Sequence, residues 1–202
     1  MLALQNFDFN QDYSLENERV LLRPLAFSDL PFLEKYVLEE PDLWQFSLVA
    51  IQDKADLEKY IHDAIEARNQ KTAYPYIVLD KLTQTYVGVT RFYDIQLAFA
   101  TTQLGYTWYS KKVWGTGLNQ ACKFLLLEFA FEKMGFERVE FRADNNNKRS
   151  IAAMQKIGCT VEGVLRNHLP MPGGKRRDSI VLSILKEEWT NKLKTNLAAQ
   201  LK

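Results

Sequence analysis

The sequence predicts a mixed α/β fold in which one central sheet of about seven strands is flanked by helices. Short segments rich in β-branched and aromatic residues alternate with longer segments whose apolar residues recur at helical spacing. Their order is strand, two helices, three strands, helix, strand, helix and two strands. A pair of glycines, Gly115 and Gly117, also lies where a strand gives way to a long apolar helix.

Composition indicates an ordinary globular protein, and we expect one domain over residues 1–202. Of the 202 residues, 47% are hydrophobic and 25% are charged, and the formal net charge of +1 gives no general attraction for nucleic acid or anionic membranes. No apolar run reaches the ~18 residues of a membrane helix, and the N-terminus lacks a signal-peptide pattern. Cys122 and Cys159 lie in apolar contexts typical of reduced core residues. We therefore expect a cytoplasmic protein without a metal site, either a monomer or a homodimer.

The N-terminal third is expected to hold one strand and two helices. Residues 1–15 show no clear period and are expected to form a loose arm. Residues 19–24 read as a strand that ends at a proline. For the first helix we expect Ser28 as the N-cap and Pro31 in the first turn, and the second helix covers residues 53–69.

The middle of the chain is predicted to be β-structure followed by a long helix. Residues 74–79 and 86–93 are strands joined by a short polar turn, which predicts a hairpin. The strand at 104–109 leads into the glycine pair, and a broad apolar face predicts a helix over residues 118–133. The remaining elements are a strand at 138–142, a helix at 148–156, strands at 160–165 and 179–185, and a polar helix at 186–202 anchored by Trp189.

The glycine pair is the strongest candidate for a ligand site. Glycine has no Cβ, so the backbone can turn sharply and approach a ligand closely. Free N–H groups and the helix dipole at a helix start attract phosphate. The spacing does not match a P-loop, because Leu118-Asn119 follows the second glycine, nor a dinucleotide fingerprint, because Gln120 takes the third glycine's place. A phosphate-binding loop and a plain strand-to-helix turn are the two interpretations left open.

Three motifs together resemble one enzyme family. The spacing Lys112-x-x-Gly115-x-Gly117 resembles the Arg/Gln-x-x-Gly-x-Gly/Ala signature of the GNAT acyl-CoA N-acyltransferases, with lysine in place of arginine or glutamine. Asn147-x-x-Ser150, followed by the run at 155–159 and by Glu162-Gly163, is similar to the Rim-type branch, which includes ribosomal-protein N-terminal acetyltransferases. The resemblance covers residues 18–189. It implies the GNAT fold, with a mostly antiparallel sheet splayed between its fourth and fifth strands.

The resemblance also implies acetyl-CoA as cosubstrate, held in that splay. The pantetheine arm would pair with backbone around Trp108 and Tyr109 and bond to Asn147, while the pyrophosphate would meet backbone amides of the glycine loop. The implied cofactor-binding residues are Trp108, Tyr109, Lys112, Val113, Trp114, Gly115, Thr116, Gly117, Leu118, Asn147 and Ser150.

Acyl transfer needs a neutral amine, a donor to the developing oxyanion and a proton for the leaving thiolate. Many family members supply that proton from a tyrosine seven residues after the asparagine, but here that residue is Met154, so the role falls to Ser150 or to water. The alternative is that Ser150 only faces the helix start. His168, with an unperturbed pKa of ~6.5, is the candidate base, unless it lies in a solvated turn. Asp94 and Glu162 are weaker candidates.

Two segments are expected to form the acceptor walls, the loop at 41–50 and the segment at 166–176. The first is apolar, with Leu43, Trp44, Phe46 and Leu48, and the second is basic. A polyamine would need carboxylates around its charges, so these walls favour the α-amine of a peptide or protein N-terminus. A small-molecule amine as acceptor and a non-catalytic CoA-binding module are the alternatives.

Overall fold

The central sheet has eight strands in the order β1-β2-β3-β4-β5-β6-β8-β7, in a computed structural model that describes residues 7–201. Neighbouring strands are antiparallel except β5 and β6, which are parallel. The strands are β1 (Leu15–Glu16), β2 (Val20–Pro24), β3 (Ala73–Asp80), β4 (Thr85–Gln96), β5 (Thr101–Tyr109), β6 (Arg138–Asp144), β7 (Thr160–Pro170) and β8 (Arg176–Leu185). The mixed, mostly antiparallel α/β fold is thus confirmed, with the two-residue β1 as the additional strand.

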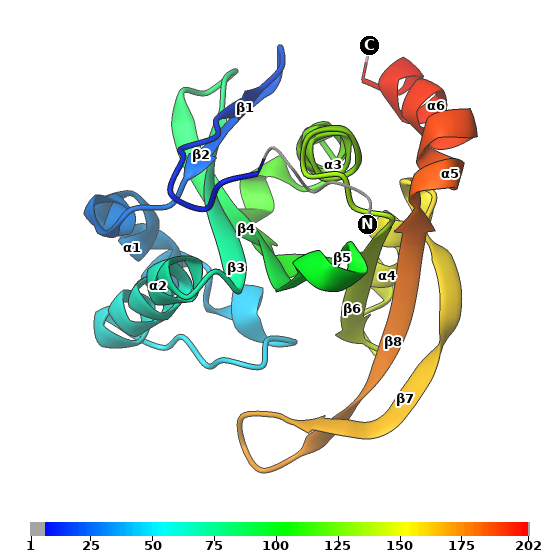
Figure 1. Ribbon diagram of the computed structural model, residues 1–202. Coiled ribbons are helices and arrows are strands. Elements are labelled where there is room, and N and C mark those ends of the chain that lie inside the picture. Colours follow the sequence, from blue (N-terminus) through cyan, green and yellow to red (C-terminus); the bar gives the residue numbers. More distant parts are fainter. Residues whose placement is uncertain (1–6, 202) are drawn as a thin grey trace.

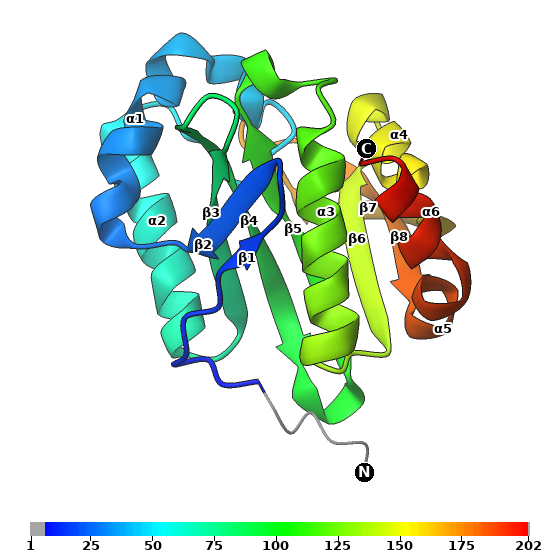
Figure 2. The same cartoon turned by 90° about the horizontal axis from the view of Figure 1, so that it is seen from above.

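Helices cover both faces of this sheet (Figures 1 and 2). They are α1 (Leu30–Glu39), α2 (Lys54–Asn69), α3 (Leu118–Glu128), α4 (Lys148–Lys156), α5 (Lys186–Glu188) and α6 (Lys194–Ala199). One apolar core lies under α1 and α2 and contains the fully buried Leu33 and Leu57. A larger core lies under α3 and contains Leu126 and Phe141. The sheet therefore separates two apolar cores.

The strands β5 and β6 pair only where they begin. The ladder joins Thr101 to Arg138, Thr102 to Val139 and Gln103 to Glu140, and β5 then continues to Tyr109 without a partner in β6. Along its whole length β6 pairs instead with β8. The two parallel strands diverge beyond this short ladder. This confirms the predicted splay, because β5 and β6 are the fourth and fifth strands that the sequence predicted.

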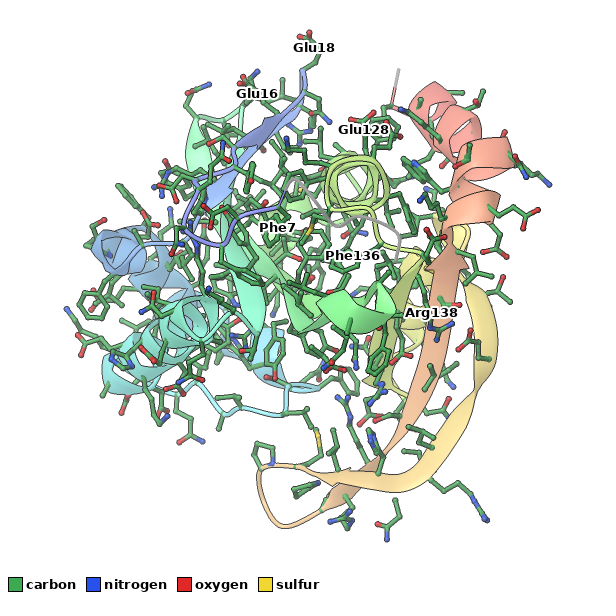
Figure 3. All side chains as sticks on the ribbon, viewed as in Figure 1. Phe7, Glu16, Glu18, Glu128, Phe136 and Arg138 are labelled. Atoms are coloured by element: carbon green, nitrogen blue, oxygen red, sulfur yellow. The ribbon has the colours of Figure 1, made fainter. Side chains whose placement is uncertain are left out.

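The N-terminal segment is packed rather than loose over the residues that the structure describes. Phe9 is 5% exposed and Tyr13 is 8% exposed, and the ring of Phe7 packs against Tyr74 and Phe129. In Figure 3, Phe7 lies among the packed side chains whereas Glu18 projects outward. The expectation of a loose arm was wrong from residue 7 onward, because isolated aromatic anchors leave no periodic pattern. Residues 1–6 of the expected arm lie outside the described part.

The first helix also begins differently from the expectation. A short 3₁₀ turn, Phe27–Asp29, precedes α1, and Asp29 rather than Ser28 is its N-cap. The buried Asp29 carboxylate accepts the Ala26 N–H (2.9 Å) and is paired with Arg23. This ion pair determines where the chain turns, so the predicted Ser28 cap was wrong, while Pro31 does lie in the first turn.

The strands β7 and β8 form a hairpin longer than the sequence suggested. Both strands extend past their predicted ends, to Pro170 and from Arg176, with a register shift between Leu165 and Leu169. Figure 1 shows the hairpin curving away from the sheet, toward the segment that joins α1 and α2. The C-terminal helix is divided by a π-helical turn at Trp189–Leu193, and Trp189, 1% exposed, is the anchor that the sequence predicted.

Candidate active site

The glycine loop joins β5 to α3 through the 3₁₀ turn Lys111–Val113. Gly115 and Gly117 have φ values of 75° and 85°, in the left-handed region that favours glycine, and Gly117 is the N-cap of α3. A Cβ added at either glycine would meet no atom within 4 Å. Both glycines therefore border open space, and neither is explained by tight packing against the protein.

The backbone of this loop leaves a set of N–H groups free. The amides of Val113, Trp114 and Thr116 already bond to carbonyls within the turn. Among residues 7–201, the N–H groups of Gly115, Gly117, Leu118, Asn119 and Gln120 donate no hydrogen bond. They surround the start of α3, where the helix dipole adds positive potential. The loop can therefore bind an anion such as a phosphate. Of the predicted stretch from Val113 to Leu118, only Gly115, Gly117 and Leu118 offer free amides.

Buried polar contacts fix the position of the loop. Glu40, 6% exposed at the end of α1, accepts hydrogen bonds from the Ser110 hydroxyl and from the Lys111 N–H, each at 2.6 Å. Lys111 also pairs with Asp42, whereas Lys112 has no ion pair in the described part of the chain. No sequence pattern points to Glu40, because its role depends on a residue 70 positions away.

The two halves of the predicted cofactor site meet across the divergent strands. Asn147 caps α4, and its Oδ1 accepts the Ser150 N–H (3.1 Å). Between these two residues, the Arg149 guanidinium lies 3.4 Å from the ring centroid of Trp114 in the glycine loop. The start of α4 is thereby held beside the glycine loop. The hydroxyl of Ser150 has no hydrogen-bond partner among the residues described and is free to contact a ligand.

The end of β5 lies between the two cores. Trp108 packs edge-on against Trp44 and Tyr36, with ring centroids 5.3 and 5.9 Å apart. The Tyr109 carbonyl accepts the Trp114 indole N–H (2.9 Å). Trp44 therefore supports β5 from the core side, although the sequence suggested that it lines a cleft. The backbone of β5 before Tyr109 has no partner in β6 and can pair with an extended ligand.

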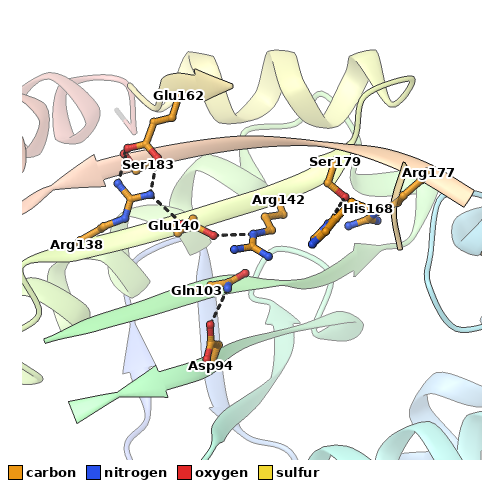
Figure 4. Close-up of polar contacts among 10 residues, drawn as sticks. All are labelled: Asp94, Gln103, Arg138, Glu140, Arg142, Glu162, His168, Arg177, Ser179 and Ser183. Atoms are coloured by element: carbon orange, nitrogen blue, oxygen red, sulfur yellow. Dashed lines mark hydrogen bonds and ion pairs between the residues drawn. The ribbon is translucent and has the colours of Figure 1, made fainter. Parts of the chain in front are cut away.

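His168 lies on β7 in a polar group near the end of β6, shown in Figure 4. Its Nδ1 is 3.0 Å from the Ser179 hydroxyl, which also accepts the Arg177 Nε–H (2.9 Å). Burial, and then the guanidinium groups of Arg142, Arg177 and Arg176, lower the pKa of His168 below its usual value. This shift favours the neutral imidazole, which is the form that can act as a base. No contact joins His168 to Ser150 in the described structure.

The weaker base candidates have other partners. Glu162 is paired with Arg138, whose hydrogen bonds are the largest cause that lowers the pKa of this carboxyl to about 2. It also accepts the Ser183 hydroxyl (2.7 Å), so it is a structural anion and not a base. Asp94 accepts hydrogen bonds from Gln96 and Gln103.

One buried charge was missed by sequence reasoning. Lys123 on α3 is 5% exposed, and its Nζ donates to the hydroxyls of Thr107 (3.0 Å) and Thr90 (3.4 Å). In the described part of the chain no carboxylate pairs with it, and burial lowers its pKa to about 8. Lys123 also lies 5.9 Å from the Phe141 ring of β6, so it is placed between the diverging strands. The available signal was a lysine inside the apolar run of α3.

This burial predicts a pH-dependent stability. The folded-state pKa of Lys123 lies below that of the unfolded chain, so between pH 8 and ~10 the unfolded state binds more protons. Raising the pH through this window should stabilise the wild type relative to Lys123→Met by up to ~3 kcal/mol. Denaturant unfolding at several pH values measures the difference. Burial also raises the pKa of Cys122 and Cys159 to about 12, but the wild type and Lys123→Met both contain these thiols, so their titration is common to the two proteins. Parallel stability curves would contradict the prediction.

A pocket of about 560 Å³ opens beside the end of β6. Its walls come from both predicted acceptor segments and from the neighbouring strand ends: Gln45, Asp144, Asn146, Met171, Pro172, Gly173, Lys175, Arg176, Arg177 and Asp178. Of the loop at 41–50, only Gln45 lines it, and the four apolar residues of that loop do not. The expected basic wall is therefore present in this pocket, while the expected apolar wall is not part of it.

Comparison with known proteins gives consistent matches. The family model described as "Acetyltransferase (GNAT) domain" matches residues 19–160. "Putative ribosomal N-acetyltransferase YdaF" of Bacillus subtilis (strain 168) is 26% identical over 168 residues, 76% of this chain and 91% of that protein. A solved GCN5-related N-acetyltransferase from Brucella melitensis has a TM-score of 0.88 at 21% identity, covering 98% of this chain and 89% of that one. Mycobacterium smegmatis RimJ in complex with CoA-disulfide has a TM-score of 0.79 at 18% identity, covering 94% and 93%.

Proposed function

The chain belongs to the GNAT acetyltransferase family, and from this premise we propose which acetyl donor and which acceptor it uses. It is an N-acetyltransferase, and therefore an acyltransferase enzyme. We propose that the donor is acetyl-CoA and that the acceptor is the α-amine of a peptide or protein N-terminus. The observation that carries the proposal is the glycine loop, with its free N–H groups, beside two parallel strands that diverge.

The donor proposal rests on the fit of three neighbouring features. The free amides of Gly115 and of residues 117–120, together with the exposed Lys112, suit a pyrophosphate. The unpaired edge of β5 offers backbone groups to an extended, amide-containing chain such as pantetheine. Asn147, whose Oδ1 is used by the cap, retains its amide hydrogens as donors. The CoA disulfide named for the RimJ structure belongs to that protein and shows that a similar fold accommodates a CoA compound.

The acceptor proposal rests on the charge of the pocket and on the relatives. Three cations and two carboxylates line the pocket, which disfavours a polyamine with several positive charges. The name of the Bacillus subtilis relative, a putative ribosomal N-acetyltransferase, favours a protein acceptor. This relative is 26% identical to the chain, so it supports the class of acceptor rather than its identity.

We assign the chemical roles from position and protonation. The thioester supplies the acetyl group, which moves to the amine nitrogen while the nitrogen loses one proton and the sulfur gains one. An α-amine with a pKa of ~7.7–8.0 is about a tenth neutral at pH 7, so a modest base suffices. His168, whose neutral form the lowered pKa favours, lies near the pocket wall and can accept that proton directly or through water. The free Ser150 hydroxyl beside Asn147 can donate to the leaving sulfur.

The acceptor is tested with an amine panel, by following free thiol as acetyl-CoA is consumed. A short peptide with an N-terminal serine or alanine should show a higher kcat/KM than spermidine or an aminoglycoside at pH 7. Between pH 7 and pH 9 its rate should rise no more than ~10-fold, whereas amines of pKa ~10.4 gain ~100-fold in neutral form. A polyamine preferred at both pH values would overturn the acceptor proposal. Binding of acetyl-CoA without turnover of any amine would favour the non-catalytic alternative.

A further inference from the structure

The pocket beside β6 contains a buried guanidinium with unused donors. Arg177, on β8, is 8% exposed and lines the pocket. Its Nε donates to the Ser179 hydroxyl (2.9 Å), but within residues 7–201 no group accepts from its Nη1 or Nη2, and no carboxylate forms an ion pair with it. Burial lowers the pKa of Arg177, and the charge of Asp144 opposes this shift without forming an ion pair. The interaction of this buried cation with anions is therefore incomplete, and a ligand can complete it.

The other charged groups around the pocket leave a surplus of positive charge. Lys175 is exposed at the pocket wall and its Nζ has no partner among the described residues. Arg176 bonds to the backbone carbonyls of Asn167 and His168. Each of the two carboxylates accepts one backbone hydrogen bond, Asp144 from the Asn146 N–H (2.8 Å) and Asp178 from the Asn167 N–H (2.7 Å). Among the described residues, Arg177 therefore keeps both Nη groups and Lys175 its Nζ as unused donors, whereas Arg176 keeps only its Nη1.

A carboxylate matches these donors best. The two Nη groups of a guanidinium present parallel N–H donors in one plane, which a carboxylate can accept with both oxygens. Ser179 holds Arg177 by its Nε, so the plane of the guanidinium is fixed before a ligand arrives. An ammonium group at this point would instead meet two unpaired cations, which disfavours basic acceptors.

We infer that Arg177, assisted by Lys175, forms a carboxylate subsite that selects acceptor peptides with an acidic residue close to the N-terminus. The inference rests on the proposed function, because the acceptor is taken to be a peptide α-amine. It adds a specificity that the family membership does not contain. Asp144, at the end of β6, and Gln45, opposite the hairpin, complete the wall around this subsite.

The test compares two peptides that differ only in charge, Ser-Glu-Ala-Ala-Tyr and Ser-Gln-Ala-Ala-Tyr. For the wild type, kcat/KM should be ~10- to 100-fold higher for the acidic peptide, through a lower KM, as one charged hydrogen-bonded pair provides. In Arg177→Met this preference should fall to about one, and Arg177→Lys should restore part of it. Lys175→Met, an exposed change that leaves the core intact, should reduce the preference by a smaller factor. The control Lys192→Met removes an exposed charge far from the pocket and should keep the full preference.

Binding gives a second readout that does not require turnover. The N-acetylated forms of the same two peptides should bind the wild type with the same acidic preference by calorimetry, and Arg177→Met and Lys175→Met should weaken it. An equal affinity for both peptides, or a preference that survives in both variants, overturns the subsite. Acetylation of both peptides at equal rates would overturn only this inference. Turnover of a small amine without acetylation of either peptide would overturn the proposed acceptor class. The ratio of the affinities for the two N-acetylated peptides would still decide whether the subsite exists.

Discussion

Replacing Gly117 with tryptophan should abolish acetyl-CoA binding, with a loss of affinity of at least ~100-fold, or ~2.7 kcal/mol. Gly117 is the N-cap of α3 and borders open space, so a side chain there would point into the region where the free amides face a ligand. The change also removes the glycine that the φ value of 85° favours. Calorimetric titration with acetyl-CoA measures the effect.

Gly174→Trp is the matched control for Gly117→Trp. Gly174 has a φ value of 79°, also borders open space, and lies in the β7–β8 hairpin away from the glycine loop. Both positions have a similar positive φ, and both variants add the same side chain, so the control separates the effect of location from that of a bulky residue at a glycine site. The control should bind acetyl-CoA normally. An unchanged affinity in a folded Gly117→Trp protein would refute the assignment of the loop as a phosphate site.

Ser150→Ala should lower kcat by ~100-fold while changing the affinity for acetyl-CoA much less. The Ser150 hydroxyl has no protein partner among the described residues, and the N–H that bonds to Asn147 is retained in alanine, so the cap of α4 stays intact. A loss confined to kcat marks an interaction made mainly in the transition state. Rapid-quench or thiol-release kinetics, together with a binding titration, separate the two quantities.

Asn147→Ala provides the contrasting variant for Ser150→Ala. It removes both the cap of α4, typically worth ~1 kcal/mol, and the amide donors proposed for pantetheine. This variant should therefore lose thermal stability and acetyl-CoA affinity together. If Ser150→Ala shows the same joint loss, its hydroxyl has a structural role and the proton for the leaving sulfur comes from water.

Local sequence patterns predicted the elements well where one short segment decides the outcome. The β3–β4 hairpin follows from two strand-forming segments joined by a short polar turn, and α4 has the predicted bounds, Lys148–Lys156. The glycine loop was found for the same reason, since positive φ values at a strand-to-helix junction require glycine locally. The first helix start was mispredicted because Arg23 pairs with Asp29, and such a pair is invisible to a pattern of single residues.

The candidate site shows the same division. The motif residues at 112–118 and 147–150 were identified from spacing, whereas their contact through Trp114 and Arg149 depends on how β5 and β6 diverge. The pH behaviour of His168 depends on burial and on three arginines that come from two other strands. The buried Lys123 could not be distinguished from a solvated lysine, because only the packing of α3 on the sheet decides whether its side chain is covered.

The order of strands and helices, the glycine loop and the family motifs can be predicted from sequence, because each is encoded within a few neighbouring residues. The folded chain was needed to show which amides of the loop remain free, that Glu40 secures the loop, and that Arg177 lines a pocket and has no ion-pair partner within residues 7–201. Hydrogen-bond satisfaction and desolvation depend on groups brought together from distant parts of the chain, so local patterns do not reveal them. A charged residue therefore shows its role only when its surroundings are assembled.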